Sequence, residues 1–287
     1  MNVHAFDQQQ ADNGFVAMNH AEPAFFPVTM QEMQTDDGFR VPGYRAVRRD
    51  DTMDILAVHS DGYNLTPYED KVEIFRDAIQ ESNLDTTGMI EMLDMSHNGG
   101  RLFGGYTLPA HRVEIKEGDE VALKIAYWDS YDGSRALTIR AGAYRFACAN
   151  YALSGKDVVN IKRKHTKNND LGGIMEMVMG TLNSYMDDTE NYRRWTGIPV
   201  NSLKAQATFD GIQGATEALK DNLLKRWVEA TQYTGEGTLW DLYNVFTAWA
   251  THTEGKGGNP LNSQAQRMER VVKLQNSRVW NELQLAA

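Results

Sequence analysis

The chain has 287 residues, of which 41% are hydrophobic and 24% charged, proportions that are ordinary for a globular protein. No apolar run reaches the roughly 18 residues of a membrane-spanning helix, so we expect no membrane span. The formal net charge of −10 argues against a surface coated with positive charge for duplex DNA, but it leaves room for a local basic patch.

The redox and targeting signals point to the cytoplasm. The single cysteine can form no internal disulfide, which fits a reducing compartment. The first residues lack the basic flank and apolar core of a secretory signal. We therefore expect a cytoplasmic protein.

Residues 1–40 are polar and irregular, with isolated aromatic residues. We expect an extended N-terminal arm here, holding at most one short strand and docking on its own core or on a neighbouring subunit. Alternating apolar and polar residues then predict strands at Tyr44–Arg49 and Ile55–His59, joined by a polar turn.

A helix is predicted to begin near residue 66. Thr66 is suited to cap it, Pro67 falls at its first position, and Glu69 follows in its first turn. Apolar residues at spacings of three and four follow and predict its buried face: Val72, Phe75 and Ile79.

Strands are predicted next at Met89–Met95 and Gly100–Ala110, on either side of a turn at 96–100. The glycines of segment 99–106 would let a ligand approach the backbone, and the alternative is a twisted, bulged strand. The segment matches neither a P-loop nor a dinucleotide fingerprint. Segment 121–153 predicts a hairpin, because half-buried alternation flanks Asp132 and Gly133, which suit a tight turn.

The second half of the chain has helical periodicity. It predicts helices within 171–187, 202–233, 239–250 and 264–285. Strands followed by helices indicate an α+β fold, with an N-terminal antiparallel β-sheet and a packed helix before a mainly helical C-terminal half. We expect an arm at 1–40, a β-rich core at 41–153, and a helical region at 154–287 packed on that core.

Several segments resemble a phage and plasmid family called domain of unknown function 932. Segments 130–134 (SYDGS) and 145–153 (RFACANYAL) are similar to its SHDGS turn and RVVCxNTL strand. Segments 56–63, 161–166 and 238–244 are similar to its LGVVSxxY, IRHT and TxWxxYNA motifs. The chain departs from the family at Tyr131, where His is usual, and at Tyr151, where Thr is usual. The resemblance, which spans residues 41–252, implies a fold and a phage or mobile-element origin but no reaction.

The densest positive charge lies in segment 155–167 (GKDVVNIKRKHTK). Phosphate binding draws on such groups, because releasing condensed counterions supplies affinity. We predict phosphate contacts from its basic residues: Lys162, Arg163, Lys164, His165 and Lys167. The alternative is a solvated loop or the start of a helix.

A second basic group is Tyr192-Arg193-Arg194-Trp195. Single-stranded nucleic acid binds where bases stack on aromatic rings and cations follow the backbone, so Arg193 and Arg194 would extend the track while Tyr192 or Trp195 stacks. The alternative is the end of an amphipathic helix with Trp195 buried. We expect two arginines of the hairpin, Arg140 and Arg145, to line the sheet face of the groove.

Signals for an enzyme are weak. The seven histidines are scattered, and the sequence has neither a cysteine cluster nor a Gly-x-Ser-x-Gly elbow. Cys148 is more ordinary as a buried cysteine than as a nucleophile. Asp129 and Asp132 with Glu114 keep a metal-dependent nuclease as a third interpretation. We expect no catalytic residue, cofactor or metal.

Two functions from different classes follow. The β-then-α plan is similar to that of phage single-strand annealing proteins, so we expect a phage-encoded, homo-oligomeric protein that binds single-stranded DNA in recombination or replication. It would act without cofactor chemistry in the cytoplasm of a bacterial host.

The alternative is a phage structural or host-interaction (anti-defence) protein that binds no nucleic acid.

Overall fold

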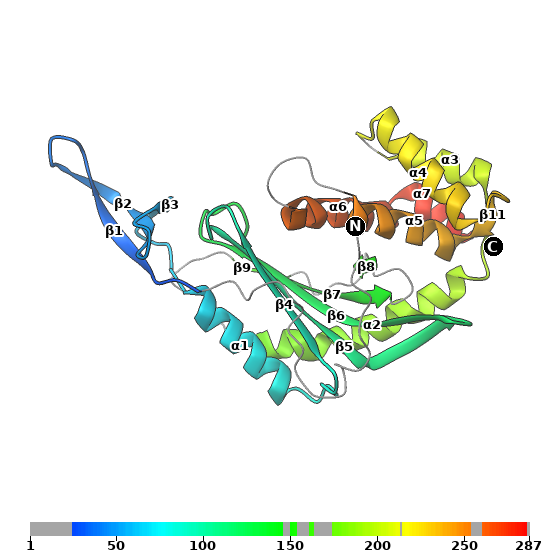
Figure 1. Cartoon of the computed structure of the whole chain (residues 1–287), viewed down its shortest axis with the longest axis horizontal. Helices are drawn as coiled ribbons and strands as arrows, with labels where there is room; N and C mark the ends of the chain where they lie inside the picture. Colours follow the sequence, from blue (N-terminus) through cyan, green and yellow to red (C-terminus); the bar gives the residue numbers. More distant parts are fainter. Residues whose placement is uncertain are drawn as a thin grey trace. The chain divides into compact units, whose positions relative to one another are not determined.

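The computed structural model describes residues 25–145, 150–153, 161–163, 174–212, 214–253 and 260–285 (Figure 1). Antiparallel strands fill most of the first half and helices most of the second, which confirms the predicted α+β fold. Among the described helices, none combines the length and the apolar character that a membrane crossing requires.

The chain divides into two compact units. Unit 1 comprises residues 1–110, 124–140 and 159–182, and unit 2 comprises residues 111–123, 141–158 and 183–287. Strands β5 (Arg101–Lys116), β6 (Asp119–Ser130) and β7 (Leu137–Arg145) contribute residues to both units. Three of the unit boundaries, at residues 110, 123 and 140, therefore fall inside strands.

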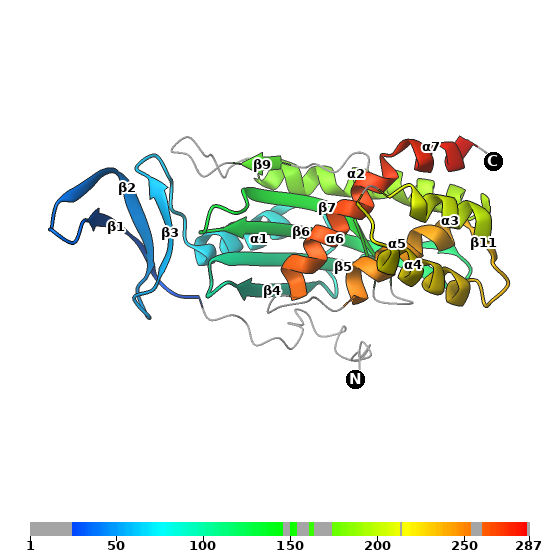
Figure 2. The ribbon, with the colours of Figure 1, turned by 90° about the horizontal axis from the view of Figure 1, so that it is seen from above.

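The largest sheet has the strand order β4-β5-β6-β7-β8, in which β4 is Ile90–Ser96 and β8 is Asn150–Leu153 (Figure 2). Strand β9 (Ile161–Arg163) also pairs with β7. Gly133 has a φ of +70° between β6 and β7, as the predicted hairpin turn requires. The prediction that β6 is half-buried is wrong, because eleven of its twelve residues are buried in its central place in the sheet.

Helix α1 (Tyr68–Glu81) belongs to unit 1, and its predicted apolar face is buried. Phe75 of this helix stacks on Tyr127 of β6, with ring centroids 4.0 Å apart. Gly104 of β5 makes room for the Tyr127 ring, since a Cβ atom at this position would lie 2.1 Å from the Cζ atom of Tyr127. The glycine-rich segment is therefore the start of strand β5, which agrees with the strand interpretation and not with a ligand loop.

A three-stranded antiparallel sheet precedes α1 in unit 1. Its strands are β1 (Val28–Gln34), β2 (Arg40–Arg49) and β3 (Ile55–Ser60), in the order β1-β2-β3. Strand β1 is the one short strand that the predicted arm allowed for, and it pairs with β2. The remainder of the predicted arm, residues 1–24, lies outside the described residues.

The helices after α2 (Ile174–Trp195) lie in unit 2. They are α3 (Ser202–Asp210), α4 (Glu217–Ala230), α5 (Leu239–His252), α6 (Pro260–Gln275) and α7 (Arg278–Leu285), with two short paired strands, β10 (Pro199–Asn201) and β11 (Glu236–Thr238). Helix α5 is buried on almost every side. The predicted terminal helix is two helices, because the chain leaves helical geometry at residues 276–277.

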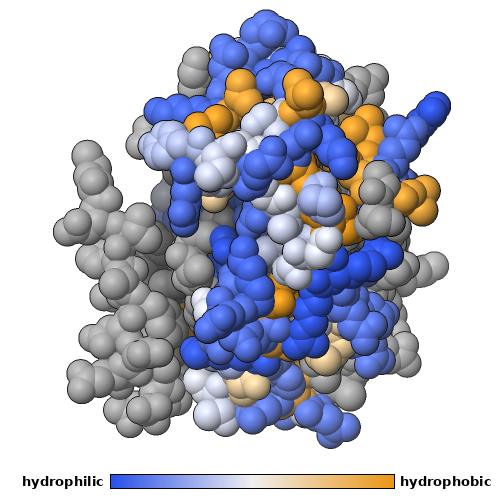
Figure 3. Space-filling model, turned by 90° about the vertical axis from the view of Figure 1, so that its right-hand side faces the viewer, coloured by the Kyte–Doolittle hydropathy of each residue, from blue (hydrophilic) through white to orange (hydrophobic). Residues whose placement is uncertain are grey.

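The surface in Figure 3 is mostly hydrophilic, with hydrophobic residues in smaller separate areas. Large side chains such as Trp227, Trp240 and Trp280 are fully buried. The helices of unit 2 therefore turn apolar faces inward and polar faces to solvent, as amphipathic helices do.

Replacing Gly104 by alanine should lower the free energy of unfolding by about 1–3 kcal/mol, because the new methyl group overlaps the Tyr127 ring. Chemical denaturation of the Gly104→Ala variant measures this change. The matched control is Gly62→Ala, where the nearest atom to a new Cβ is 3.8 Å away. Equal effects of the two substitutions would contradict the close packing of Tyr127 on β5.

Candidate nucleic-acid interface

The basic segment is described in part, at strand β9. Lys162 lies opposite Thr138 of β7 in the antiparallel register, and Arg163 lies opposite Leu137. Within the described chain, β7 is the one strand that pairs with β9. Two predicted phosphate contacts therefore lie on a strand at the edge of the sheet, whereas Lys164, His165 and Lys167 lie outside the described residues.

Arg193 and Arg194 lie in the last turn of α2, where a cation is favourable beside the partial negative charge of the helix end. Both are exposed. Arg193 donates to the backbone carbonyl of Glu114 at 3.0 Å, and Arg194 donates to the side chain of Gln284 at 2.7 Å. Within the described part of the chain, neither arginine forms an ion pair, so both keep positive charge at the surface of unit 2.

The prediction that Tyr192 or Trp195 stacks with bases is wrong. Tyr192 is 1% exposed and Trp195 is 5% exposed. The Tyr192 ring lies 4.9 Å from that of Trp240, and the Trp195 ring lies 5.3 Å from that of Trp280. These rings lie three residues apart on the inner face of α2 and form part of the core of unit 2, as the alternative interpretation held for Trp195.

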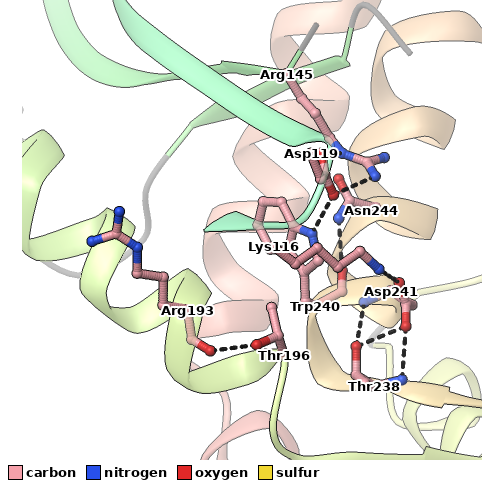
Figure 4. Close-up of polar contacts among 9 residues, drawn as sticks. All are labelled: Lys116, Asp119, Arg145, Arg193, Thr196, Thr238, Trp240, Asp241 and Asn244. Carbon is pink, nitrogen blue, oxygen red and sulfur yellow. Dashed lines mark hydrogen bonds and ion pairs between the residues drawn. The ribbon is translucent and has the colours of Figure 1, made fainter. Parts of the chain in front are cut away.

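The two arginines of β7 do not line an open groove, which corrects that prediction. Arg140 is 6% exposed, and its guanidinium carbon lies 5.7 Å from the centroid of the Trp128 ring. Arg145 is bound to Asp119 by two hydrogen bonds of 2.6 Å, and Trp240 donates to the same carboxylate at 2.8 Å (Figure 4). Arg145 therefore compensates a buried carboxylate, whose uncompensated burial would be costly.

A second network in unit 2 fixes the start of α5. Thr238 and Asp241 form a capping box, in which each side chain accepts a hydrogen bond from the other residue's backbone N–H. Lys116 Nζ lies 2.9 Å from the Asp241 carboxylate (Figure 4). Burial alone would raise the pKa of Asp241, but hydrogen bonds from Lys116 and Thr238 and the charge of Lys116 lower it overall. The guanidinium of Arg193 points away from these residues in Figure 4.

In unit 1, the turn that follows β6 is held by two tyrosines. The backbone N–H of Tyr68 donates to the Tyr131 hydroxyl at 2.6 Å, and the backbone N–H of Tyr131 donates to the Tyr68 hydroxyl at 2.9 Å. Their rings stack at 3.8 Å. Tyr131 therefore satisfies the first N–H of α1, which corrects the prediction of a Thr66 cap: the cap position is Pro67, which has no side-chain hydrogen bond.

Beneath these rings, Lys71 of α1 and Asp129 of β6 form an ion pair. Both side chains are buried, at 2% and 0% exposure. This pair was not among the predicted site residues, although the position of Lys71 on the apolar face of a helix is a signal for a buried charge. Asp132 of the same turn accepts from Arg101 at 2.6 Å.

These contacts bear on the nuclease interpretation. Asp129 and Asp132 are bound to cations of the chain itself. Within the described residues, no group of three or more His, Cys, Asp or Glu side chains is arranged to hold a metal ion. Cys148 lies outside the described residues. The described geometry therefore gives a metal-dependent nuclease no support.

Comparison with protein families assigns the chain to one family. Residues 55–280 match the family described as Domain of unknown function (DUF932). The chain belongs to this family. No curated protein and no solved structure gave a match.

The DUF932 assignment gives the motif residues a structural meaning. In the segment 238–244, Thr238 caps α5, Trp240 binds Asp119, and Asn244 donates to the Trp240 carbonyl at 2.8 Å. In the segment 130–134, Tyr131 holds the start of α1 and Gly133 permits the turn. Each of these described residues stabilises the fold of its own unit.

Replacing Tyr131 by phenylalanine should lower the free energy of unfolding by about 1–3 kcal/mol, because the buried N–H of Tyr68 loses its acceptor. Thermal or chemical unfolding measures the change. Tyr233→Phe is the control, since Tyr233 is 79% exposed and its hydroxyl should contribute little. A Tyr131→Phe variant as stable as the wild type would remove the hydroxyl from this account.

Asp241 should make the fold sensitive to acid. The pKa of Asp241 lies below 3.8 in the folded chain. The ionised carboxylate therefore stabilises the fold fully at a pH above its pKa in the unfolded chain. This stabilisation is lost as the pH falls through its pKa in the folded chain. The stability difference between wild type and Asp241→Asn should therefore shrink as the pH falls from about 6 to about 3. Asp221→Asn, at an exposed position on α4, is the matched control. A pH-independent effect of Asp241→Asn would contradict the assignment.

Proposed function

We propose that this DUF932 protein binds single-stranded nucleic acid through strand β9 and the basic segment around it. The observation that carries the proposal is the location of Lys162 and Arg163 on an edge strand of the main sheet in a chain of net charge −10. A basic strand at a sheet edge can follow a phosphate backbone, and counterion release would supply the affinity.

Arg193 and Arg194 support the proposal as a second basic position, in unit 2. They are exposed and form no ion pair with another described residue, whereas Arg48, Arg49 and Arg145 are each bound to a carboxylate. The binding surface therefore relies on positive charge more than on base stacking. Such a surface would discriminate poorly between sequences, as a protein that coats or anneals strands requires.

In this proposal the protein is phage- or plasmid-encoded and acts as a homo-oligomer in DNA recombination or replication, in the cytoplasm of the bacterial host and without a cofactor.

A structural or host-interaction role is the second candidate. The observation that favours it is the concentration of exposed apolar side chains in the β1–β3 sheet.

Reversing the charge of two residues in the segment, Lys162→Glu with Lys164→Glu, should weaken binding of single-stranded DNA by roughly tenfold or more. It should also reduce the slope of log affinity against log salt by about 1.4, because each lost phosphate contact removes about 0.7 for a single strand. Fluorescence anisotropy of a labelled oligonucleotide at several salt concentrations measures both quantities.

The control changes the same charge elsewhere, with Lys225→Glu and Lys273→Glu at exposed positions of α4 and α6. It should leave the salt slope almost unchanged. Equal losses in the two double variants would show that net charge, and not this segment, governs the binding, and would overturn the assignment.

A further inference from the structure

Within unit 1, the turn between β4 and β5 is bound to the β1–β3 sheet by the side chain of Asn98. Its Nδ2 donates to the Asp54 carboxylate at 2.7 Å, and its Oδ1 accepts from Arg49 at 3.2 Å. Arg49 also donates to the backbone oxygen of Asn98 at 3.0 Å. A primary amide offers a donor and an acceptor at one position, so it can bind a carboxylate and a guanidinium together.

The residue that follows Asn98 has to be glycine. Gly99 has a φ of +83°, in the left-handed region that residues with a side chain rarely adopt. A Cβ atom at this position would lie 2.2 Å from the Cζ atom of Phe26. The Phe26 ring in turn carries the guanidinium of Arg49, whose central carbon lies 3.8 Å from the ring centroid. Backbone conformation and packing therefore both require the sequence Asn-Gly in this turn.

An asparagine followed by glycine is chemically labile, because glycine has no side chain to hinder ring closure at its own nitrogen. Asn98 is exposed to water. The backbone nitrogen of Gly99 would form a bond to the Cγ atom of Asn98, and the side-chain nitrogen would leave as ammonia. The resulting succinimide adds water and opens to aspartate or isoaspartate. The reaction consumes one water molecule and needs no oxidant or cofactor.

The product would not fit the contacts that Asn98 makes. Hydrogen bonds from Thr52 and Asn98 lower the pKa of Asp54, so this carboxylate is ionised at neutral pH and would repel a second carboxylate. Arg49 already binds Asp51 at 2.7 Å, so one guanidinium would face three carboxylates. An isoaspartate would also lengthen the backbone of the turn by one carbon atom.

We propose that Asn98 is a modification site, at which spontaneous deamidation loosens the β1–β3 sheet from the main sheet. A second contact would persist, because His59 Nε2 lies 2.6 Å from the backbone oxygen of Tyr131. The sheet therefore stays attached at the turn after β6 and gains freedom at the turn after β4. Since the fold requires Gly99, the change accumulates with the age of the protein. The inference is independent of the proposed nucleic-acid binding.

Peptide mapping of the folded full chain, after incubation at mildly alkaline pH, tests the chemistry. The peptide that holds Asn98 should lose its amide and gain isoaspartate, and mapping separates it from the other Asn-Gly pair, at 13–14. Asn222 is the internal control: it is exposed and accepts from Arg226 at 2.9 Å, but leucine follows it. Asn222 should keep its amide over the same period. A folded chain in which Asn98 keeps its amide as long as Asn222 would overturn the proposal.

Hydrogen exchange followed by mass spectrometry tests the consequence. Asn98→Asp should speed exchange in residues 44–60 by roughly tenfold, because a hydrogen bond to a charged group is lost and like charges meet. Asn222→Asp is the matched variant and should leave exchange in the β1–β3 sheet unchanged. If Asn98→Asp also left it unchanged, the proposal would be overturned even where the wild type loses the amide.

Discussion

The central strand β6 carries two buried carboxylates, and much of the described fold is arranged to compensate them. Asp119 begins the strand and is bound by Arg145 and by the indole N–H of Trp240 in unit 2. Asp129 lies near its other end and is paired with Lys71 in unit 1. Removing one partner of a buried ion pair costs about 3–5 kcal/mol, so each carboxylate fixes the helix or strand that supplies its partner.

This constraint gives the described residues of segments 130–134 and 238–244 a structural role. Tyr131 and Gly133 shape the turn after Asp129, while Thr238, Trp240 and Asn244 position α5 beside Asp119. Their polar groups are directed at one another and at the backbone, within each unit. The exposed Arg193 and Arg194 lie outside these networks. A binding function can therefore change at these basic positions while the buried contacts keep the fold.

Local pattern predicted the elements well. Apolar spacing identified α1 and α5, and Asp132-Gly133 identified the β6–β7 hairpin, because these signals lie within a few residues of one another. The corrections came from contacts that are distant in sequence. Thr66 was predicted as a cap since its type suits that role, but Tyr131 takes the role from 63 residues away. The half-buried alternation assigned to β6 failed because residues on both faces of this strand are buried.

The sequence predicted the exposed positive charge of the candidate site, but it did not predict that the aromatic residues beside this charge are buried. Arg193 and Arg194 lie on the outside of α2, whereas Tyr192 and Trp195 face the core, and this distinction depends on where α5 and α7 pack. Sequence alone places the four residues together without showing which side of the helix is covered. For the same reason Arg145 could not be distinguished from a phosphate ligand before its contact with Asp119 was seen.

The most direct measurement is the affinity of the wild-type chain for single-stranded DNA and for duplex DNA of the same length, by fluorescence anisotropy at low salt. The account predicts salt-sensitive binding that favours the single strand, since the basic positions are few and suit one phosphate backbone. Absence of binding to either form at low salt would contradict the account, and equal or stronger binding to the duplex would contradict its single-strand assignment.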